Sequence, residues 1–493
     1  MNEISAEPVE NKPTTIDHHQ NKKLGLQINT NSVLTKKLYD LAETSTSHGL
    51  PNIVRTNRIS LKIIWLICFL AALGACIYMV YKTLNEYYGY EVVTNIQVVN
   101  ENSPTFPTVT ICNVNPLTSK QAEQLIEKIS YVNTEMNVSI FASTFDIFSS
   151  FIGYLNDFIY LAQSNAFAHD ISNDERKTLG NLPIILKCTF NEQSCGSDQL
   201  KWHYDASMGN CLRFNSGFEL DLMRSLNSGR AGGLHLELII LEAENKYVSL
   251  FSYSEGLRVF IHNSSFDIRE SEGVDVPLSK ATNIAIKRTF VSKQASPYSD
   301  CVDIDSYNSE FVKFIKDSAR TYRQIDCFDL CLQKKIIQSC GCYEVRYPRL
   351  YNHSTGCNIK DLYWCSRNVS QTFRTNQIDP ECVAKCPLEC DSVKYGLSLS
   401  SSTYPSKQNA EFYAIKYPSY SYGLLKNRSV EMNIYYSDLS YTLISESPKT
   451  SVIDLFSNIG GTMGLYIGVS FLSFVEIVEA LLEIIFISFN INV

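Results

Sequence analysis

The stretch LFSNIGGTMGLYIGVSFLSFV, residues 455–475, contains 21 residues and no charged side chain. It lies between Asp454 and Glu476. A helix of about 20 apolar residues is long enough to cross the hydrocarbon core of a bilayer. The stretch therefore predicts a membrane-spanning helix, and the alternative is a buried helix in the core of a soluble domain.

Glycines and polar side chains distinguish this stretch from a simple anchor. Gly460, Gly464 and Gly468 recur every four residues, a spacing that lets helices pack closely in lipid. Polar residues run through the same helix: Asp454, Ser457, Asn458, Thr462, Ser470 and Ser473. The glycines alone would favour ordinary packing between helices, but the polar residues favour a water-filled path.

Carboxylates follow directly. Glu476, Glu479 and Glu483 are spaced three and four residues apart and so share one helical face. Carboxylates facing lipid would be costly. Around a shared axis they would form rings that attract cations. The pattern therefore predicts a cation pore built from several copies of this helix.

A second uncharged run, IIWLICFLAALGACIYMVY at residues 63–81, predicts another membrane span. The basic residues Lys36, Lys37, Arg55, Arg58 and Lys62 precede it. Positive charge is enriched on the cytoplasmic side of a span, so we expect both chain ends in the cytoplasm and residues 83–453 outside the cell.

Cysteines and glycosylation sequons support that topology. Residues 83–453 hold 14 of the 16 cysteines, an even number that favours disulfides in an oxidising compartment. The five Asn-X-Ser/Thr sequons fall in the same segment, at Asn137, Asn263, Asn352, Asn368 and Asn427.

Composition excludes other classes. The chain has 43 Lys+Arg against 51 Asp+Glu, a net charge of −8, which argues against nucleic-acid binding. It has no Gly-rich phosphate loop, no His-Glu-x-x-His and no His pair with metal-ligand spacing, so we expect neither an enzyme nor a cofactor. Strands are predicted at 91–99, 234–262 and 430–436, and helices in parts of 117–187.

Over nearly its whole length the chain resembles the degenerin/epithelial sodium channel family. Six motifs carry the resemblance, in order: His48-Gly49, TFPTVTICN (Thr105–Asn113), GLRVFIH (Gly256–His262), CFDLCLQKKIIQSCGC (Cys327–Cys342), CPLECDSVKY (Cys386–Tyr395) and NIGGTMGLYIGVSFLSFVEIVE (Asn458–Glu479).

The resemblance implies a membrane protein with two transmembrane helices per subunit and a disulfide-rich α+β ectodomain of palm, knuckle, finger, ball and thumb regions. It implies an amiloride-sensitive sodium channel of the plasma membrane, assembled as a homotrimer or as a heterotrimer with related subunits. We expect a cytoplasmic tail with a re-entrant segment (1–60), the first helix (61–82), the ectodomain (83–453), the second helix and pore (454–487) and a cytoplasmic stub (488–493).

The resemblance also assigns roles to residues. Gly468-Val469-Ser470 corresponds to the selectivity filter, where the pore helix breaks, and Val469 replaces the more frequent Ala or Ser. His48 and Gly49 are gating residues beneath this constriction. A large side chain at Ser457 would hold the pore open, and Tyr298 would couple the thumb to the first span.

Asp454 lies one helical turn above Ser457. Three Asp454 carboxylates would ring the outer mouth and bind blocking calcium, with Glu476 and Glu479 lining the pore. The alternative for Asp454 is a surface residue that caps its own helix.

Seven disulfides follow from the resemblance. They are Cys112–Cys211, Cys188–Cys195, Cys301–Cys390, Cys327–Cys386, Cys331–Cys382, Cys340–Cys365 and Cys342–Cys357. The last five form a nested ladder that would make the thumb a stiff lever.

The stimulus is a further expectation. Acid-sensing members carry a His pair after the first span, where this chain has Tyr90-Glu91-Val92. The segment HGLPNIVR and the absence of a long finger insertion look more like invertebrate peptide-gated members, so we expect an extracellular neuropeptide ligand. A proton-gated or constitutively open channel, an ATP-gated channel and a non-conducting two-span receptor remain as alternatives.

Overall fold

The computed structural model describes residues 35–36, 38–125, 172–196, 198–217, 221–245, 254–265, 268–318, 320–351, 354–357, 361–375 and 379–488. The predicted glycosylation sites Asn137 and Asn352 lie outside these residues, as do most of the N-terminal tail and of the expected helices in 117–187. The chain divides into two compact units, Met1–Val92 with Pro448–Val493 and Val93–Ser447. We call them the helical unit and the sheet unit.

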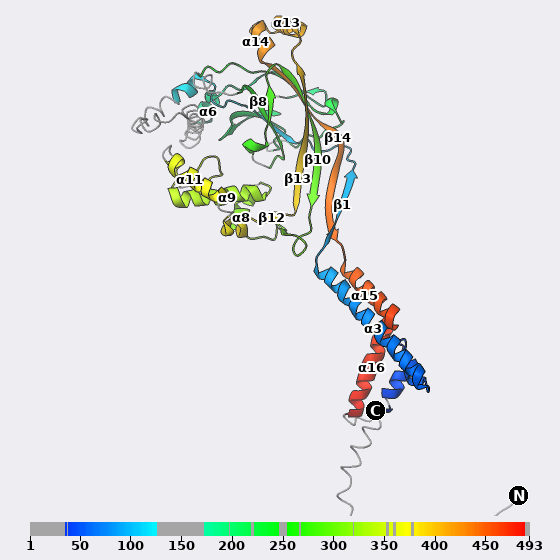
Figure 1. Ribbon diagram of the computed structural model, residues 1–493. Helices are drawn as coiled ribbons and strands as arrows, with labels where there is room; N and C mark the ends of the chain where they lie inside the picture. Colours follow the sequence, from blue (N-terminus) through cyan, green and yellow to red (C-terminus); the bar gives the residue numbers. More distant parts are fainter. Residues whose placement is uncertain are drawn as a thin grey trace, which may run out of the picture. The chain divides into compact units, whose positions relative to one another are not determined.

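The helical unit contains α2 (Leu50–Arg55), α3 (Ile59–Tyr88), α15 (Val452–Ile467) and α16 (Phe471–Ser488), and α3 runs beside α15 (Figure 1). Among the described residues, α3 alone is long and apolar enough to cross a membrane unaided. Helices α15 and α16 meet that test only when taken together, and the bend between them is 74°. Helix α3 is longer than its apolar run because seven more residues continue the helix from Lys82 to Tyr88.

The larger sheet of the sheet unit has seven strands. Six follow one another in the order β13 (Asp391–Thr403), β10 (Lys280–Ser292), β14 (Ser429–Pro448), β7 (Leu234–Ile239), β3 (Ile184–Phe190) and β4 (Gln193–Ser194). The seventh, β1 (Val92–Val99), pairs with β14. Strand β10 runs parallel to β14 and antiparallel to β13.

The smaller sheet has five strands in the order β5 (Leu200–Asp205), β6 (Gly209–Phe214), β2 (Thr108–Asn113), β8 (Gly256–His262) and β9 (Val274–Pro277). These five strands pair with their neighbours in antiparallel orientation. Its central strands β6 and β2 are buried at every position, because they have neighbours on both sides and cover on both faces.

The main hydrophobic core combines side chains from both sheets. Phe106, Phe190, Phe214 and Tyr436 meet in it at ring-centroid distances between 5.0 and 6.2 Å. Such offset and edge-to-face contacts between aromatic rings add to the stabilisation from area burial. The two sheets are therefore joined by a shared core.

Four predicted strands are confirmed, as β1, β7, β8 and β14. The prediction was wrong for residues 240–245, which follow the end of β7 at Ile239, and the predicted strand residues 246–253 lie outside the described residues. There the backbone N–H of Ile240 donates to the carbonyl of Arg428, and Asn245 donates its side-chain amide to the carbonyl of Leu117. Apolar content continued past the strand, but these long-range hydrogen bonds lead the chain out of the sheet.

Residues 301–390 form a helical disulfide module with β11 (Cys301–Val302), α8 (Glu310–Asp317), α9 (Gln324–Cys340), α11 (Arg367–Thr375), α12 (Pro380–Lys385) and β12 (Leu388–Glu389). The remaining α-helices with described bounds are α6 (Asn173–Leu179), α13 (Lys407–Lys416) and α14 (Tyr422–Arg428). The structure contains seven disulfides, and they are the pairs that the resemblance implies.

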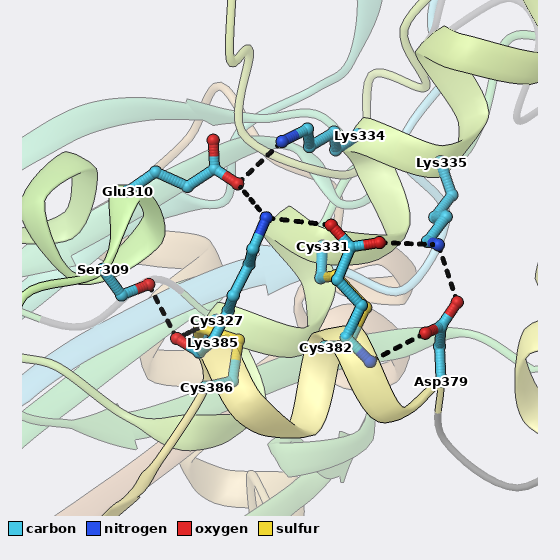
Figure 2. The surroundings of a disulfide bond; sticks show 11 residues. Ser309, Glu310, Cys327, Cys331, Lys334, Lys335, Asp379, Cys382, Lys385 and Cys386 are labelled. Carbon is cyan, nitrogen blue, oxygen red and sulfur yellow. Dashed lines mark hydrogen bonds and ion pairs between the residues drawn. A yellow bond between two sulfur atoms is a disulfide. The ribbon is translucent and has the colours of Figure 1, made fainter.

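Helix geometry explains two rungs of the ladder. Cys327 and Cys331 are four residues apart on α9 and so lie on one face, one turn apart. Cys382 and Cys386 have the same spacing at α12, and they pair with Cys331 and Cys327 respectively (Figure 2). Antiparallel pairing of two equally spaced cysteine pairs joins α9 to α12 at two points, so neither helix can rotate against the other.

A chain of ion pairs surrounds these two disulfides (Figure 2). Its members alternate in charge in the order Lys334, Glu310, Lys385, Glu381, Lys335 and Asp379, with N–O distances between 2.6 and 3.4 Å. The hydrogen bonds from Lys334 and Lys385 lower the pKa of Glu310. Water screens these partly exposed pairs, so each contributes at most about 1 kcal/mol.

Candidate functional site

The second predicted span is interrupted at Gly468. Helix α15 ends there because Gly468 adopts a left-handed conformation with φ of 69°, and its N–H donates to the carbonyl of Gly464. Helix α16 begins at Phe471, and the hydroxyl of Ser473 accepts a hydrogen bond from the N–H of Ser470 at 3.0 Å. The break covers the three residues that the resemblance assigns to the filter.

A loop from the N-terminal side lies against this break. The backbone N–H of His48 donates to the carbonyl of Ile467 at 2.8 Å, and the hydroxyl of Ser47 donates to the same oxygen at 3.2 Å. The last carbonyls of a helix lack partners within the helix. The loop satisfies one of them, so the end of α15 is a specific docking point for residues 46–49.

The fit between the loop and the break requires a glycine. A Cβ added to Gly468 would lie 2.5 Å from Nδ1 and 2.6 Å from Cγ of His48. The structure thus places His48 and Gly468, two motifs that are 420 residues apart in the chain, in direct contact.

Thr46 connects the same loop to α16. Its hydroxyl lies 2.8 Å from the hydroxyl of Ser473 and donates to Oε2 of Glu476 at 3.0 Å. Ser473 is buried and also lies 3.3 Å from the hydroxyl of Ser470. The sequence interpretation missed Thr46 and Ser47, although the run Thr44-Ser-Thr-Ser-His48 is a signal of local hydrogen bonding.

The loop is held from its other side by α2 and α3. Gly49 has φ of 92° and a Cβ position 3.4 Å from the ring of Phe69 on α3. Helix α2 begins directly after Gly49, with Pro51 in its first turn. Backbone N–H groups in the first turn have no partner within the helix, so a proline, which lacks that N–H, fits there. Gly49 therefore supplies the sharp turn between the docked residues and the helices.

Asp454 caps its own helix. Oδ2 of Asp454 accepts hydrogen bonds from the N–H and the hydroxyl of Ser451, and the N–H of Asp454 donates back to that hydroxyl. This reciprocal arrangement is a capping box. Ser457 lies one turn further along α15 and is exposed. Glu479, on α16, is exposed as well.

Tyr298 belongs to the sheet unit, in the loop between β10 and β11. Its side chain is partly buried and its N–H donates to the carbonyl of Ala295. Its contact with the first span involves the other unit and stays a prediction.

Three glycosylation sequons fall on described residues. Asn368 on α11 and Asn427 on α14 are exposed. Asn263 is partly buried, and its side-chain oxygen accepts from the N–H and the hydroxyl of Ser265. Asn368 and Asn427 are therefore the more accessible acceptors.

An ion pair joins the ends of the two helical segments. Nζ of Lys449 lies 2.5 Å from a carboxylate oxygen of Glu91, and the N–H of Lys449 donates to the carbonyl of Glu91. The hydrogen bond to Glu91 raises the pKa of Lys449. This position, directly after α3, therefore holds an ion pair between a lysine and a carboxylate.

The chain is similar in sequence to known ion channels. The family model described as the amiloride-sensitive sodium channel matches residues 41–480. The chain is 24% identical to the bile acid-sensitive ion channel of Mus musculus, over 89% of this chain and 86% of that one. It is 23% identical to the FMRFamide-activated amiloride-sensitive sodium channel of Cornu aspersum, over 92% and 83% respectively.

The chain is also 28% identical to the epithelial sodium channel subunit alpha of Pan troglodytes, over 64% of this chain and 45% of that subunit. Among solved structures, a proton-activated chloride channel matches with a TM-score of 0.32 and 7% identity, over 86% of this chain and 98% of that one. The family model covers the first predicted span, the disulfide module, the break at Gly468 and the second predicted span as far as residue 480. The chain therefore belongs to the amiloride-sensitive sodium channel family, also called the degenerin/epithelial sodium channel family.

Proposed function

We propose that the chain is a subunit of a trimeric, sodium-selective, amiloride-sensitive channel of the plasma membrane that an extracellular neuropeptide opens. The observation that carries the channel proposal is the docking of residues 46–49 on the break at Gly468. An ordinary membrane anchor or a non-conducting receptor needs neither a broken helix nor a polar loop packed against the break.

The break suits cation conduction. Where a helix is interrupted, backbone carbonyls leave the internal hydrogen-bond pattern and can face an axis. In three copies, Gly468, Val469 and Ser470 would surround that axis with carbonyl and hydroxyl oxygens. Glu476 and Glu479 would add negative charge on the cytoplasmic side and raise the local concentration of cations.

The proposed topology uses α3 as the first span and the bent pair α15–α16 as the second. The sheet unit would then lie outside the cell, between the two spans. Its seven disulfides and its sequons suit an oxidising, glycosylating compartment. Both chain ends would be cytoplasmic.

Peptide gating has two supports. The FMRFamide-activated relative matches over 92% of this chain. In addition, the position directly after α3 holds the Lys449–Glu91 ion pair and the sequence Tyr90-Glu91-Val92, which contains no histidine. A proton switch that relies on histidine would lack that residue at this position.

The test is to express the chain in oocytes and apply amidated neuropeptides at pH 7.4, or acid down to pH 5 without peptide. We expect a sodium current that appears with peptide and disappears with amiloride. Current evoked by acid alone would refute peptide gating, and the absence of any amiloride-blocked current, also after co-expression of related subunits, would refute the channel.

The proposed calcium ring at Asp454 competes with its capping role. Asp454→Asn removes the charge and weakens the cap, whereas Ser451→Ala weakens the cap and keeps the charge. If the ring exists, calcium block weakens in Asp454→Asn and stays normal in Ser451→Ala. Equal behaviour of the two variants would leave only the cap.

Two further roles are proposed for the gate. Ser457→Trp should crowd the closed helices and give a current without stimulus, and a normal resting current would refute this. Tyr298→Ala should reduce the peptide-evoked current at unchanged surface expression if Tyr298 couples the module to the pore.

A further inference from the structure

A cavity of about 580 Å³ lies in the sheet unit between the five-stranded sheet and helices α8 and α9. Its volume is in the range of known small-molecule sites, about 300 to 1,000 Å³. Its lining residues come from β8 and the segment before β9, and from α8, the start of α9 and the loop after α9. The site does not overlap the break in the second span.

Four arginines from separate segments line this cavity: Arg258 on β8, Arg269 before β9, Arg320 between α8 and α9, and Arg346 after α9. Two carboxylates, Asp326 and Asp329 on α9, line it with them. The charged groups on the cavity wall therefore comprise four guanidinium groups and two carboxylates.

Both carboxylates on the wall already have cationic partners. Arg269 contacts Asp326 at 3.2 Å and Asp329 at 2.7 Å, and Arg323 contacts Asp326 at 2.7 Å. A cationic ligand would have to displace Arg269 and would then face the other guanidinium groups. The wall therefore disfavours a cation.

Arg258 and Arg346 have carboxylate partners that do not line the cavity. Arg258 holds Asp275 with two hydrogen bonds of 2.6 and 3.0 Å, and Arg346 contacts the buried carboxylate of Glu344. A guanidinium group has five N–H donors, so one that already binds a carboxylate retains capacity to bind another oxyanion. These carboxylates orient the arginines and do not line the cavity.

Apolar side chains form another part of the wall. Ile315 and Leu330 are almost fully buried, and Phe314 and Ile268 are partly exposed beside them. Serine hydroxyls add neutral hydrogen-bonding groups on the sheet side, at Ser265 and Ser271. The cavity thus combines an apolar surface with oxyanion donors at its edge.

We propose that this cavity binds an amphipathic organic anion, with its carboxylate, sulfate or sulfonate group at the arginines and its apolar body against Phe314, Ile315 and Leu330. Such a ligand would contact the five-stranded sheet and the helical disulfide module together. The proposal does not depend on which stimulus opens the pore, and a cationic amidated peptide is not its occupant.

The experiment measures binding to the purified full-length protein in nanodiscs, by equilibrium dialysis. Two probes share one steroid body, pregnenolone sulfate with an anionic group and pregnenolone without one. We expect the sulfate to bind at least about tenfold more tightly, since a charge-assisted hydrogen bond changes affinity by about 10- to 100-fold. Equal binding of the two probes would overturn the proposal.

Variants locate the site. Arg320→Gln should weaken binding of the sulfate by about 10- to 100-fold, because it removes one guanidinium group from the cavity wall. The ion pairs that the other lining arginines make with their carboxylates stay in place. Ser271→Glu adds a negative charge at an exposed lining position before β9 and should weaken binding as well, so a misfolded Arg320→Gln does not end the test. Arg230→Gln, an exposed arginine outside the cavity, is the matched control.

Three results would overturn the assignment. They are unchanged binding in Ser271→Glu, an equal loss in Arg230→Gln, and displacement of the steroid sulfate by Phe-Met-Arg-Phe-amide, which would place a cationic peptide in the cavity. Because binding is measured without current, a failure here leaves the proposed channel function intact, and a chain that carries no current can still bind the probe.

Discussion

Gly468→Ala is the sharpest test of the contact between the N-terminal loop and the broken span. Two costs follow from the structure. An alanine with φ of 69° loses about 1 to 2 kcal/mol relative to its preferred right-handed conformation. Its Cβ would also lie 2.5 Å from Nδ1 of His48, which forces the ring away.

Displacing His48 would break its hydrogen bond to the carbonyl of Ile467, worth about 1 kcal/mol. The docked arrangement therefore loses about 2 to 3 kcal/mol, which is roughly a 30- to 150-fold shift away from docking. If the docked loop shapes the conducting break, amiloride-blocked sodium current and the sodium-to-potassium permeability ratio should both fall.

Two controls separate this mechanism from general damage. Gly74→Ala changes a helical glycine of α3 with no neighbour within 4 Å of the new Cβ, so it should leave current and selectivity unchanged. His48→Ala combined with Gly468→Ala removes the clash but keeps the backbone cost, so the double variant should be less impaired than additivity predicts.

The assay is two-electrode recording in oocytes, with surface biotinylation to correct for expression. Wild-type selectivity in Gly468→Ala would refute the reasoning. Strict additivity of the two substitutions would show that the contact between His48 and Gly468 has no energetic consequence.

Three other predictions concern different parts of the chain. Thr46→Val removes the hydrogen bonds to α16, worth about 1 to 3 kcal/mol, and should alter single-channel conductance. The control is Thr83→Val, because the Thr83 hydroxyl donates to a carbonyl within α3, and it should leave the conductance unchanged. Equal effects of the two variants would contradict a specific role for Thr46. Burial lowers the pKa of His262 to about 4, so the folded state loses about 3 kcal/mol of stability as the pH falls from 6.5 towards 4. His262→Gln should therefore make the thermal unfolding temperature less dependent on pH in this range. An unchanged dependence on pH would contradict this. In denaturant unfolding, Glu310→Gln should lower the free energy of unfolding by less than about 1 kcal/mol. Loss of the Cys331–Cys382 disulfide should lower it by about 2 to 5 kcal/mol. The reverse order would show that the ion pairs contribute more than the disulfide.

Local patterns were sufficient where one segment decides its own structure. Uncharged runs of bilayer length located α3 and the pair α15–α16, and alternating apolar residues located β1 and β14. The resemblance supplied the disulfide pairs and the position of the break. Where long-range hydrogen bonds compete with local content, as after Ile239, the prediction from the sequence was wrong.

The sequence by itself determined the two apolar segments, the concentration of cysteines between them and the family, because each is written in consecutive residues or in their spacing. Only the tertiary structure decided that residues 46–49 dock on the break at Gly468, that Thr46 holds Glu476, that Asp454 caps its own helix and that four arginines line one cavity. These arrangements depend on contacts between residues far apart in the chain, whose hydrogen bonds and sterics exist only once the helices and sheets have packed.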